Sequence, residues 1–127
     1  MNNISSLRKN IASLEAQRKK IIAYLLNAHD MVDGSIYTVY KKCGSKNCKC
    51  AKGKLHGPFN YLSRKINGRT KLTFVRRADE PGIEKMAQDY RKYITHMARL
   101  NKIDRKIYDM IAMIKKIKTS SYEPKKN

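Results

Sequence analysis

The chain has 127 residues, the size of one domain, and its 29 lysine and arginine residues against 10 acidic ones give a net charge of +19. Its apolar fraction of 41% is enough for a modest core and argues against wholesale disorder. The longest uncharged and largely apolar run, Ile21–Ala28, is much too short to span a bilayer, and we find no pattern of a secretory signal. We therefore expect a basic, cytoplasmic protein that does not act at a membrane.

Most of the positive charge lies in the middle of the chain. Residues 34–77 carry twelve bases and no acidic residue, whereas the two flanking segments have net charges of only +2 and +5. A concentration of one sign of charge attracts polyanions such as nucleic acids. We expect a single domain, 1–127, with an N-terminal helix (1–33), a basic centre that we call the tip (34–77), a long C-terminal helix (78–118) and a disordered tail (119–127).

The N-terminal segment has the periodicity of an amphipathic helix of about 24 residues. Apolar residues recur at spacings of three and four from Ile4 to Ala28, and only Arg18 interrupts them. Ser5 or Ser6 can cap the start of this helix, which we expect to end near His29–Asp30.

A second and longer helix is expected from Asp79 or Glu80 to about Lys118. Pro81 suits the first turn of a helix, and the lysines near the end suit the negative end of its dipole. The apolar stripe of this helix has one polar interruption, Asp104. A helix of about 37 residues would be roughly 55 Å long.

Neither stripe is stable in water, so the simplest arrangement packs one helix against the other. The predicted fold is α+β: two long antiparallel helices, forming a helical hairpin or coiled coil, with a small zinc-clipped antiparallel β-sheet at the tip. The longer helix leaves apolar residues without a partner, which favours a homodimer, although the N-terminal residues could bend back over them or the end could fray. The residues expected at the dimer interface are Ile103, Ile107, Met110, Ile111 and Ile114.

All three cysteines lie within eight residues, and a histidine follows with the spacing C-x4-C-x-C-x5-H. Three thiolates and one imidazole complete a tetrahedral Zn²⁺ site with no open position for water, which favours a structural metal. An odd number of cysteines in a chain that is not exported argues against disulfides. The expected ligands are Cys43, Cys48, Cys50 and His56, with His29 as an alternative fourth ligand.

A β-hairpin is predicted where Asn67-Gly68 joins the runs Phe59–Ile66 and Arg69–Arg76, and Ser35–Lys42 is expected to form a third strand. A two-residue turn places Ile66 opposite Arg69, Arg64 opposite Lys71, Leu62 opposite Thr73 and Tyr61 opposite Phe74. We expect the face with Phe59, Tyr61, Leu72 and Phe74 to be the core side. The face with Arg64, Arg69, Lys71 and Thr73 would then be exposed.

Bases that oppose each other across two strands repel one another unless an anion binds to them. Arg64 and Lys71 are such a pair, and the tip is therefore a candidate phosphate-binding surface. The residues expected to contact nucleic acid are Lys41, Lys42, Lys46, Lys49, Lys52, Lys54, Arg64, Arg69, Lys71, Arg76 and Arg77.

The segment from Cys43 to Pro58 resembles a poorly characterised family of small bacterial and archaeal proteins. Its shared core is C-G-x3-C-x-C-x2-G-x2-H-G-P, followed by an aromatic strand and a helical, often coiled-coil, tail. The matching residues are Cys43, Gly44, Cys48, Cys50, Gly53, His56, Gly57 and Pro58. The resemblance covers roughly residues 34–110. It implies the metal-clipped fold and, for some members, a link with mobile elements, but no activity.

The acid-free tip lacks the carboxylates and nucleophile motifs that hydrolytic or nuclease chemistry needs, so we do not expect an enzyme. We expect a zinc-containing protein that binds DNA, in preference to RNA, through phosphate contacts of the hairpin that are largely independent of sequence. Such a protein would associate with the nucleoid. Two alternatives stay open.

One alternative is an RNA-binding or ribosome-associated protein, in which rings of the tip stack on unpaired bases if they are exposed. We favour a core position for these rings, which are Tyr37, Tyr40, Phe59 and Tyr61. The other alternative is an adaptor that binds a partner protein through its coiled-coil helices.

Overall fold

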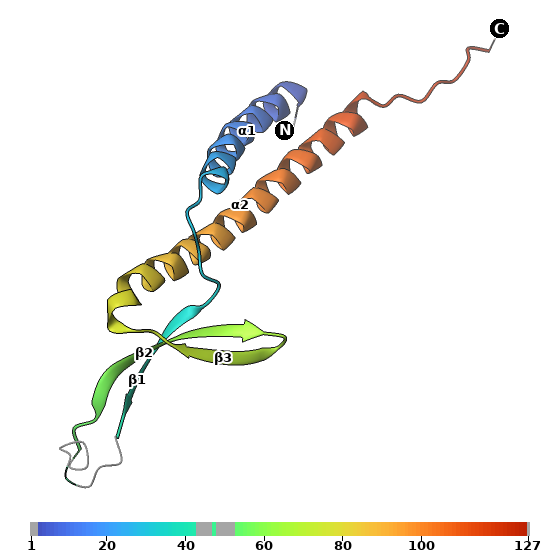
Figure 1. Ribbon diagram of the computed structural model, residues 1–127. Helices are drawn as coiled ribbons and strands as arrows, with labels where there is room; N and C mark the ends of the chain where they lie inside the picture. The colour runs from blue at the N-terminus through green and yellow to red at the C-terminus, as the bar shows by residue number, and fades with distance from the viewer. Residues whose placement is uncertain (1–2, 43–46, 48–52, 127) are drawn as a thin grey trace. The chain divides into compact units, whose positions relative to one another are not determined.

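The computed structural model describes residues 3–42, 47 and 53–126. Its elements are α1 (Ile4–Leu26), β1 (Ser35–Lys41), β2 (His56–Ile66), β3 (Arg69–Phe74), the 3₁₀ turn η2 (Arg77–Asp79) and α2 (Glu80–Lys118). Figure 1 labels the α-helices and the strands. The chain divides into two compact units. One comprises Met1–Asn27 and Ile94–Asn127, and we call it the helical unit; the other comprises Ala28–Tyr93, and we call it the sheet unit.

The predicted fold class is wrong. The chain forms an N-terminal helix, a three-stranded antiparallel sheet and then one long C-terminal helix, instead of two long antiparallel helices with a sheet at the tip. α1 has 23 residues and α2 has 39. The first part of α2, up to Tyr93, belongs to the sheet unit, where Ala87 is buried. The apolar stripe of α2 is therefore divided between the two units, whereas the prediction packed all of it against the N-terminal helix.

Both helices begin and end for local reasons. The Asn3 side chain accepts a hydrogen bond of 2.7 Å from the N–H of Ser6, so Asn3 is the N-cap of α1 and the predicted Ser5 or Ser6 cap is wrong. α1 ends earlier than predicted because the Asn27 amide donates to the carbonyl of Ala23 at 2.8 Å and caps the last turn. The predicted bounds of α2 are confirmed at Glu80 and Lys118.

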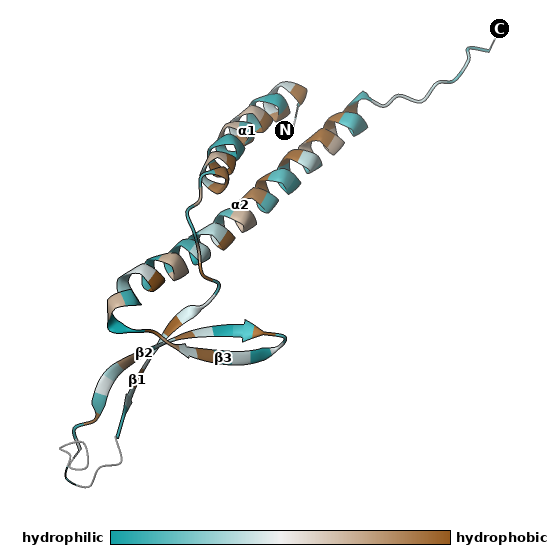
Figure 2. Ribbon diagram, in the orientation of Figure 1, coloured by the Kyte–Doolittle hydropathy of each residue, from teal (hydrophilic) through white to brown (hydrophobic). Residues whose placement is uncertain are grey.

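The helical unit has a small apolar core and an ion pair between its helices. Among its described residues, Leu7, Ile21 and Ile103 are buried. The Arg18 guanidinium donates to the Asp104 carboxylate at 2.6 Å. These are the two polar residues that interrupt the apolar stripes, and their opposite charges neutralise each other. Figure 2 shows hydrophobic and hydrophilic residues alternating along both helices. Within the described residues, no helix is long and apolar enough to cross a membrane.

The sheet unit contains three antiparallel strands in the order β1-β2-β3. The predicted hairpin register is confirmed, with Arg64 opposite Lys71 and Tyr61 opposite Phe74. The third strand is also confirmed, and it pairs with β2. A backbone bond of 3.2 Å from the N–H of Val32 to the carbonyl of Met86 ties the segment before β1 to the start of α2.

The predicted core face of the sheet is wrong. Leu62 and Val75 are only 8% and 6% exposed, although both lie on the face that was expected to be in solvent. Phe74 is 53% exposed, and Leu72 is exposed as well. The two faces both carry apolar residues, so the alternation of side chains did not decide between them. The buried face therefore carries aliphatic side chains, and the aromatic rings on the other face are half-buried or exposed.

Candidate nucleic-acid interface

The predicted zinc ligands fall mostly outside the described residues, which exclude Cys43, Cys48, Cys50 and the lysines Lys46, Lys49 and Lys52. His56 is described: it begins β2 and pairs with Lys41 at the end of β1. Directly opposed residues have Cα atoms about 4.5–5.5 Å apart. The chain therefore enters and leaves the cysteine segment at neighbouring positions of the sheet.

Gly57 shapes this end of the sheet. Its φ of +146° lies in the region that only glycine adopts readily. A Cβ at this position would lie 2.7 Å from Cδ1 of Tyr40 and 2.9 Å from the carbonyl oxygen of Val39. The close approach of β1 and β2 at the start of β2 therefore requires glycine.

His29, the alternative zinc ligand, is exposed in the segment between α1 and β1. It lines an open hollow together with Asp30 and with Gly82, Met86 and Asp89 of α2. None of these residues belongs to a strand. In residues 3–42, 47 and 53–126, no three histidine, cysteine, aspartate or glutamate side chains gather closely enough to hold a metal ion.

Two of the predicted phosphate-binding arginines have acidic partners within the chain. Arg64 donates to the Asp33 carboxylate at 2.9 Å and also to its backbone carbonyl, at 3.3 Å. Arg76 pairs with Asp79 at 3.0 Å. Both aspartates lie just outside the acid-free segment. Arg64 thus has an anionic partner that the sequence did not indicate, which lowers its repulsion with Lys71.

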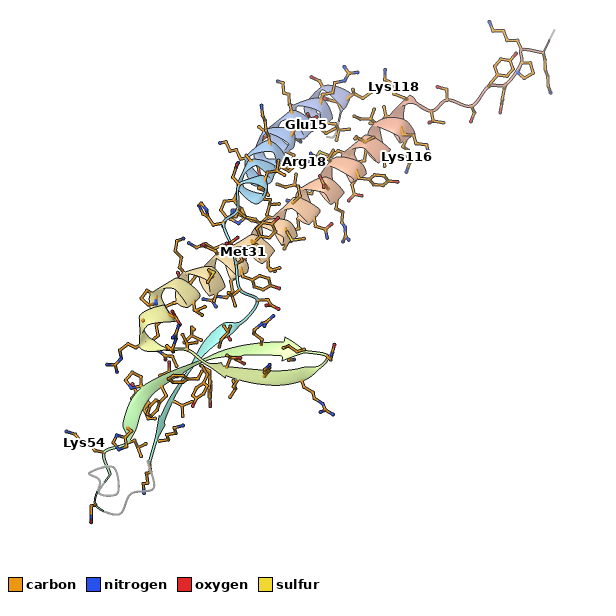
Figure 3. All side chains as sticks on the ribbon, in the orientation of Figure 1. Glu15, Arg18, Met31, Lys54, Lys116 and Lys118 are labelled. Carbon is orange, nitrogen blue, oxygen red and sulfur yellow. The ribbon has the colours of Figure 1, made fainter. Side chains whose placement is uncertain are left out.

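Other predicted cations are exposed and form no ion pair with another described residue: Lys42, Lys54, Arg69, Lys71 and Arg77. Lys54, which precedes β2, is labelled in Figure 3. Arg69 and Lys71 lie on β3, all of whose residues are exposed. They share the face of Arg64, because alternate residues of a strand point to the same side. The hairpin end therefore presents two guanidinium groups and one ammonium group on one face.

The opposite face of the sheet carries a row of aromatic rings across all three strands. Tyr37 of β1 pairs with Tyr61 of β2, and Tyr61 pairs with Phe74 of β3. Paired residues share a face, so the three rings form one row. The rings of Tyr61 and Phe74 meet edge to face, with 5.6 Å between their centroids. Tyr37 is 54% exposed. We call this surface, with Phe59 and Leu72, the aromatic face.

The Lys41 side chain lies over this aromatic face. The Lys41 amine is 5.1 Å from the ring centroid of Phe59 and 5.8 Å from that of Tyr61. It also donates a hydrogen bond of 3.2 Å to the Tyr61 hydroxyl. An ammonium group at these distances is attracted to the ring faces. The predicted contact residue Lys41 is thus placed among the rings, away from the cations of the hairpin end.

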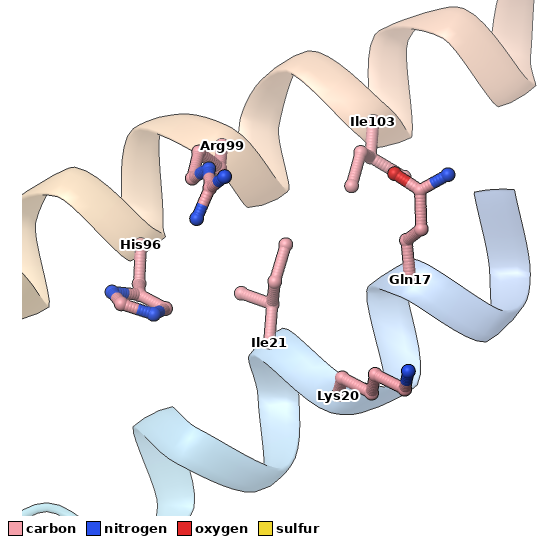
Figure 4. A pocket seen from close by; sticks show the side chains of 6 residues that line it. All are labelled: Gln17, Lys20, Ile21, His96, Arg99 and Ile103. Carbon is pink, nitrogen blue, oxygen red and sulfur yellow. The ribbon is translucent and has the colours of Figure 1, made fainter.

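A separate hollow lies in the helical unit (Figure 4). Ile21 of α1 and Ile103 of α2 provide its apolar part, and Lys20 and Arg99 provide positive charge. Nearby, the rings of Tyr24 and His96 stack at 3.8 Å with an interplanar angle of 16°. The hollow is shallow, and its lining is partly apolar and partly charged. The stacked rings contribute to the contact between α1 and α2.

The predicted dimer residues differ in their exposure. Ile103 is buried within the helical unit, and Ile107, Met110 and Ile114 are half-buried. Ile111 is 52% exposed. Only Ile111 therefore offers most of its side chain to another chain.

The family model of a domain of unknown function, DUF6788, matches residues 8–85 of the chain. The chain belongs to the DUF6788 family. The DUF6788 match includes most of α1, the cysteine segment, all three strands and the start of α2. No curated protein and no solved structure matches the chain.

One exposed cation of the sheet is not among the predicted contact residues. Lys65 is exposed and pairs with Thr70, which places it on the same face as Tyr61. The signal for it was present: the hairpin register alone assigns odd-numbered residues of β2 to the aromatic face. It was missed because that face was assigned to the core, where a lysine has no place.

Proposed function

We propose that this protein binds nucleic acid, with DNA as the expected partner, through phosphate contacts of the β2–β3 hairpin that do not depend on sequence. The observation that supports this most directly is the exposed pair Arg69 and Lys71 on β3. Neither forms an ion pair with another described residue. They lie in a segment, 34–77, with twelve bases and no acid. The implied link of some similar proteins with mobile elements also suits a DNA partner.

The proposed contacts are electrostatic, which makes them testable through salt. Phosphate binding releases counterions, so log K falls with log salt by about 0.9 per phosphate on duplex DNA. Six contacts would reduce affinity roughly 10³-fold between 50 and 200 mM salt. A slope near zero would contradict the proposal.

Local and global charge can be separated with matched variants. Arg69→Gln together with Lys71→Gln removes two charges from β3, and each lost phosphate contact lowers the salt slope by about 0.9. The control, Lys116→Gln with Lys118→Gln, removes the same charge from the end of α2. We expect the slope to fall by nearly two for the β3 pair and to stay unchanged for the control. Equal effects would indicate attraction by net charge alone.

We also propose that Cys43, Cys48, Cys50 and His56 hold a structural zinc ion. Three thiolates and one imidazole are the donors that Zn²⁺ prefers, and such a site would add folding energy to a segment with few large apolar residues. The register supports the proposal, because Lys41 and His56 bring the two ends of the cysteine segment together. We expect metal analysis of the purified protein to find one zinc ion per chain, and Cys48→Ser to lose it.

The fourth ligand is tested by two histidine variants. His56→Gln should lose zinc, and His29→Gln, which changes an exposed residue near α2, should retain it. The reverse result would assign His29 as the ligand. Retention of zinc by both variants would show that neither histidine alone is needed to hold the ion.

A second proposal is self-association through the C-terminal half of α2. Its support is the exposure of Ile111 and Ile117, which are 52% and 49% exposed. Ile111→Asp would introduce a charge into such an interface, whereas Lys115→Asp changes a residue that is already polar and exposed. We expect sedimentation at micromolar concentration to show a dimer that only Ile111→Asp converts to monomer. A monomeric wild-type protein would refute this proposal.

A further inference from the structure

The aromatic face exposes large apolar side chains on one side of the sheet. Tyr37 and Phe74 are each more than half exposed, and the row they form with Tyr61 crosses the whole sheet. Contiguous apolar patches on a protein surface mark sites that bind a partner. The core of the sheet unit lies on the opposite side, at Leu62 and Val75. The rings are therefore not needed to fill that core.

Charge indicates the chemistry of the partner. Lys41 lies over the Phe59 and Tyr61 rings, and Lys65 lies further along the same face. The strand and loop residues around them, 34–77, include no acid. A ligand that fits must therefore combine flat apolar groups with negative charge. A single-stranded nucleic acid has both, since each base offers a π-face and each phosphate a negative charge.

Duplex nucleic acid does not fit this face equally well. Base pairs in a duplex are stacked on each other, so their flat faces are not available to a protein ring. Unpaired bases can be splayed onto aromatic residues of a sheet, and a sheet a few strands wide stacks two or three of them. Adjacent strands lie about 4.8 Å apart, so Tyr37 and Phe74 are separated by roughly 10 Å, enough for separate bases.

We propose that the aromatic face binds unpaired bases of a single strand, with Tyr37 and Phe74 as stacking rings and Lys41 and Lys65 near the phosphates. Tyr61 positions its neighbours, because it meets Phe74 edge to face and accepts a hydrogen bond from Lys41. The inference rests on the proposed nucleic-acid binding and names its substrate class. It applies to single-stranded DNA and RNA alike, since stacking requires only the base.

The test compares four probes at one salt concentration: a mixed 12-nucleotide single strand as DNA and as RNA, the DNA duplex, and a DNA strand that lacks its bases. We expect at least one natural single strand to bind more tightly than the duplex and the abasic strand. Tyr37→Thr and Phe74→Thr should each weaken that binding about 5- to 140-fold, the effect of losing one stacked base. Binding of the abasic strand should not change.

Leu72→Thr is the matched control, because Leu72 is exposed on the same face but has no ring. We expect it to change affinity by no more than about twofold, and Tyr37→Phe to leave it unchanged. A second measurement needs no variant: 2-aminopurine placed in the strand should lose fluorescence when it stacks on the protein.

Four outcomes would overturn the inference. Equal affinity for the natural and abasic strands would show that bases are not contacted, and preference for the duplex would show that unpaired bases are not required. A loss with Leu72→Thr as large as with Tyr37→Thr would indicate an apolar partner instead. In the first two cases salt-dependent binding would remain, so the proposed function would stand. If none of the probes binds, the proposed function fails together with the inference.

Discussion

Two single substitutions in neighbouring strands test which face of the sheet forms the core. Leu62 of β2 is 8% exposed and Phe74 of β3 is 53% exposed. Leu62→Ala removes buried methyl groups and leaves a cavity, which costs about 3 kcal/mol of unfolding free energy. Phe74→Ala removes a larger side chain, but about half of it is already in water. We therefore expect its cost to be about 1–1.5 kcal/mol.

Hydrogen exchange of the strand amides is the suitable assay, because it reports on the sheet unit alone. The ladder includes the 2.9 Å bond from the N–H of Val75 to the carbonyl of Asn60, next to both substitutions. A loss of 3 kcal/mol accelerates exchange through opening of the sheet unit about 140-fold, and a loss of 1–1.5 kcal/mol about 5- to 12-fold. Amides at the centre of α1 serve as the internal control and should change little.

The order of the two effects is the decisive result. If Phe74→Ala reduces protection of the strands more than Leu62→Ala does, the core lies on the aromatic face. Phe74 would then be buried in solution, and the stacking inference would fail. Equal effects would mean that both faces are covered, which would also contradict an accessible aromatic face.

Two further predictions concern single contacts. The side chains of Arg18 and Asp104 are 43% and 45% exposed, so water weakens their attraction. A double-mutant cycle with Ala at both positions, measured by thermal unfolding, should give a coupling free energy of only about 0.2–1 kcal/mol. A coupling of zero would show that the ion pair does not stabilise the protein. Gly57→Ala should destabilise the sheet by about 1–3 kcal/mol because its Cβ meets Tyr40 at a positive φ. Gly82 lies in the first turn of α2, and a Cβ there would have no atom within 4 Å, so Gly82→Ala should leave stability unchanged or raise it slightly. Equal losses of stability in Gly57→Ala and Gly82→Ala would refute this reasoning.

The hairpin and the start of α2 were predictable because both depend on local sequence. Asn67 and Gly68 have positive φ values of 51° and 79°, as the two-residue turn requires, and the register follows by counting from them. Pro81 follows the first residue of α2, a position where a proline loses no hydrogen bond. No distant contact is needed for either feature.

The core face and the fold class depend on distant contacts, and both predictions were wrong. Alternation showed that Leu62 and Phe74 lie on opposite faces of the hairpin, but each face has apolar residues. The choice depends on which side of the sheet the rest of the sheet unit covers. The predicted fold assigned the whole apolar stripe of α2 to α1, but the part of α2 up to Tyr93 belongs to the sheet unit.

The sequence contains both members of the ion pair of the helical unit but does not show by itself that they meet. Arg18 and Asp104 are recognisable separately as single polar residues within apolar stripes. Their opposite charges make them candidates for pairing, yet 86 positions separate them in the chain, and their contact depends on the register between α1 and α2. Placing these two opposite charges next to each other could have predicted that register.

The cations of β3 have a second physical explanation that a charge reversal can separate from phosphate binding. β3 is an edge strand, and charged residues on an exposed edge discourage pairing with another chain. Lys71→Glu keeps a charge on the edge but repels phosphate. If Lys71 only protects the edge, this variant should remain unaggregated and bind nucleic acid almost as well as wild type. If Lys71 contacts phosphate, the variant should also remain unaggregated but lose more affinity than Lys71→Gln, and the difference should shrink as salt is raised.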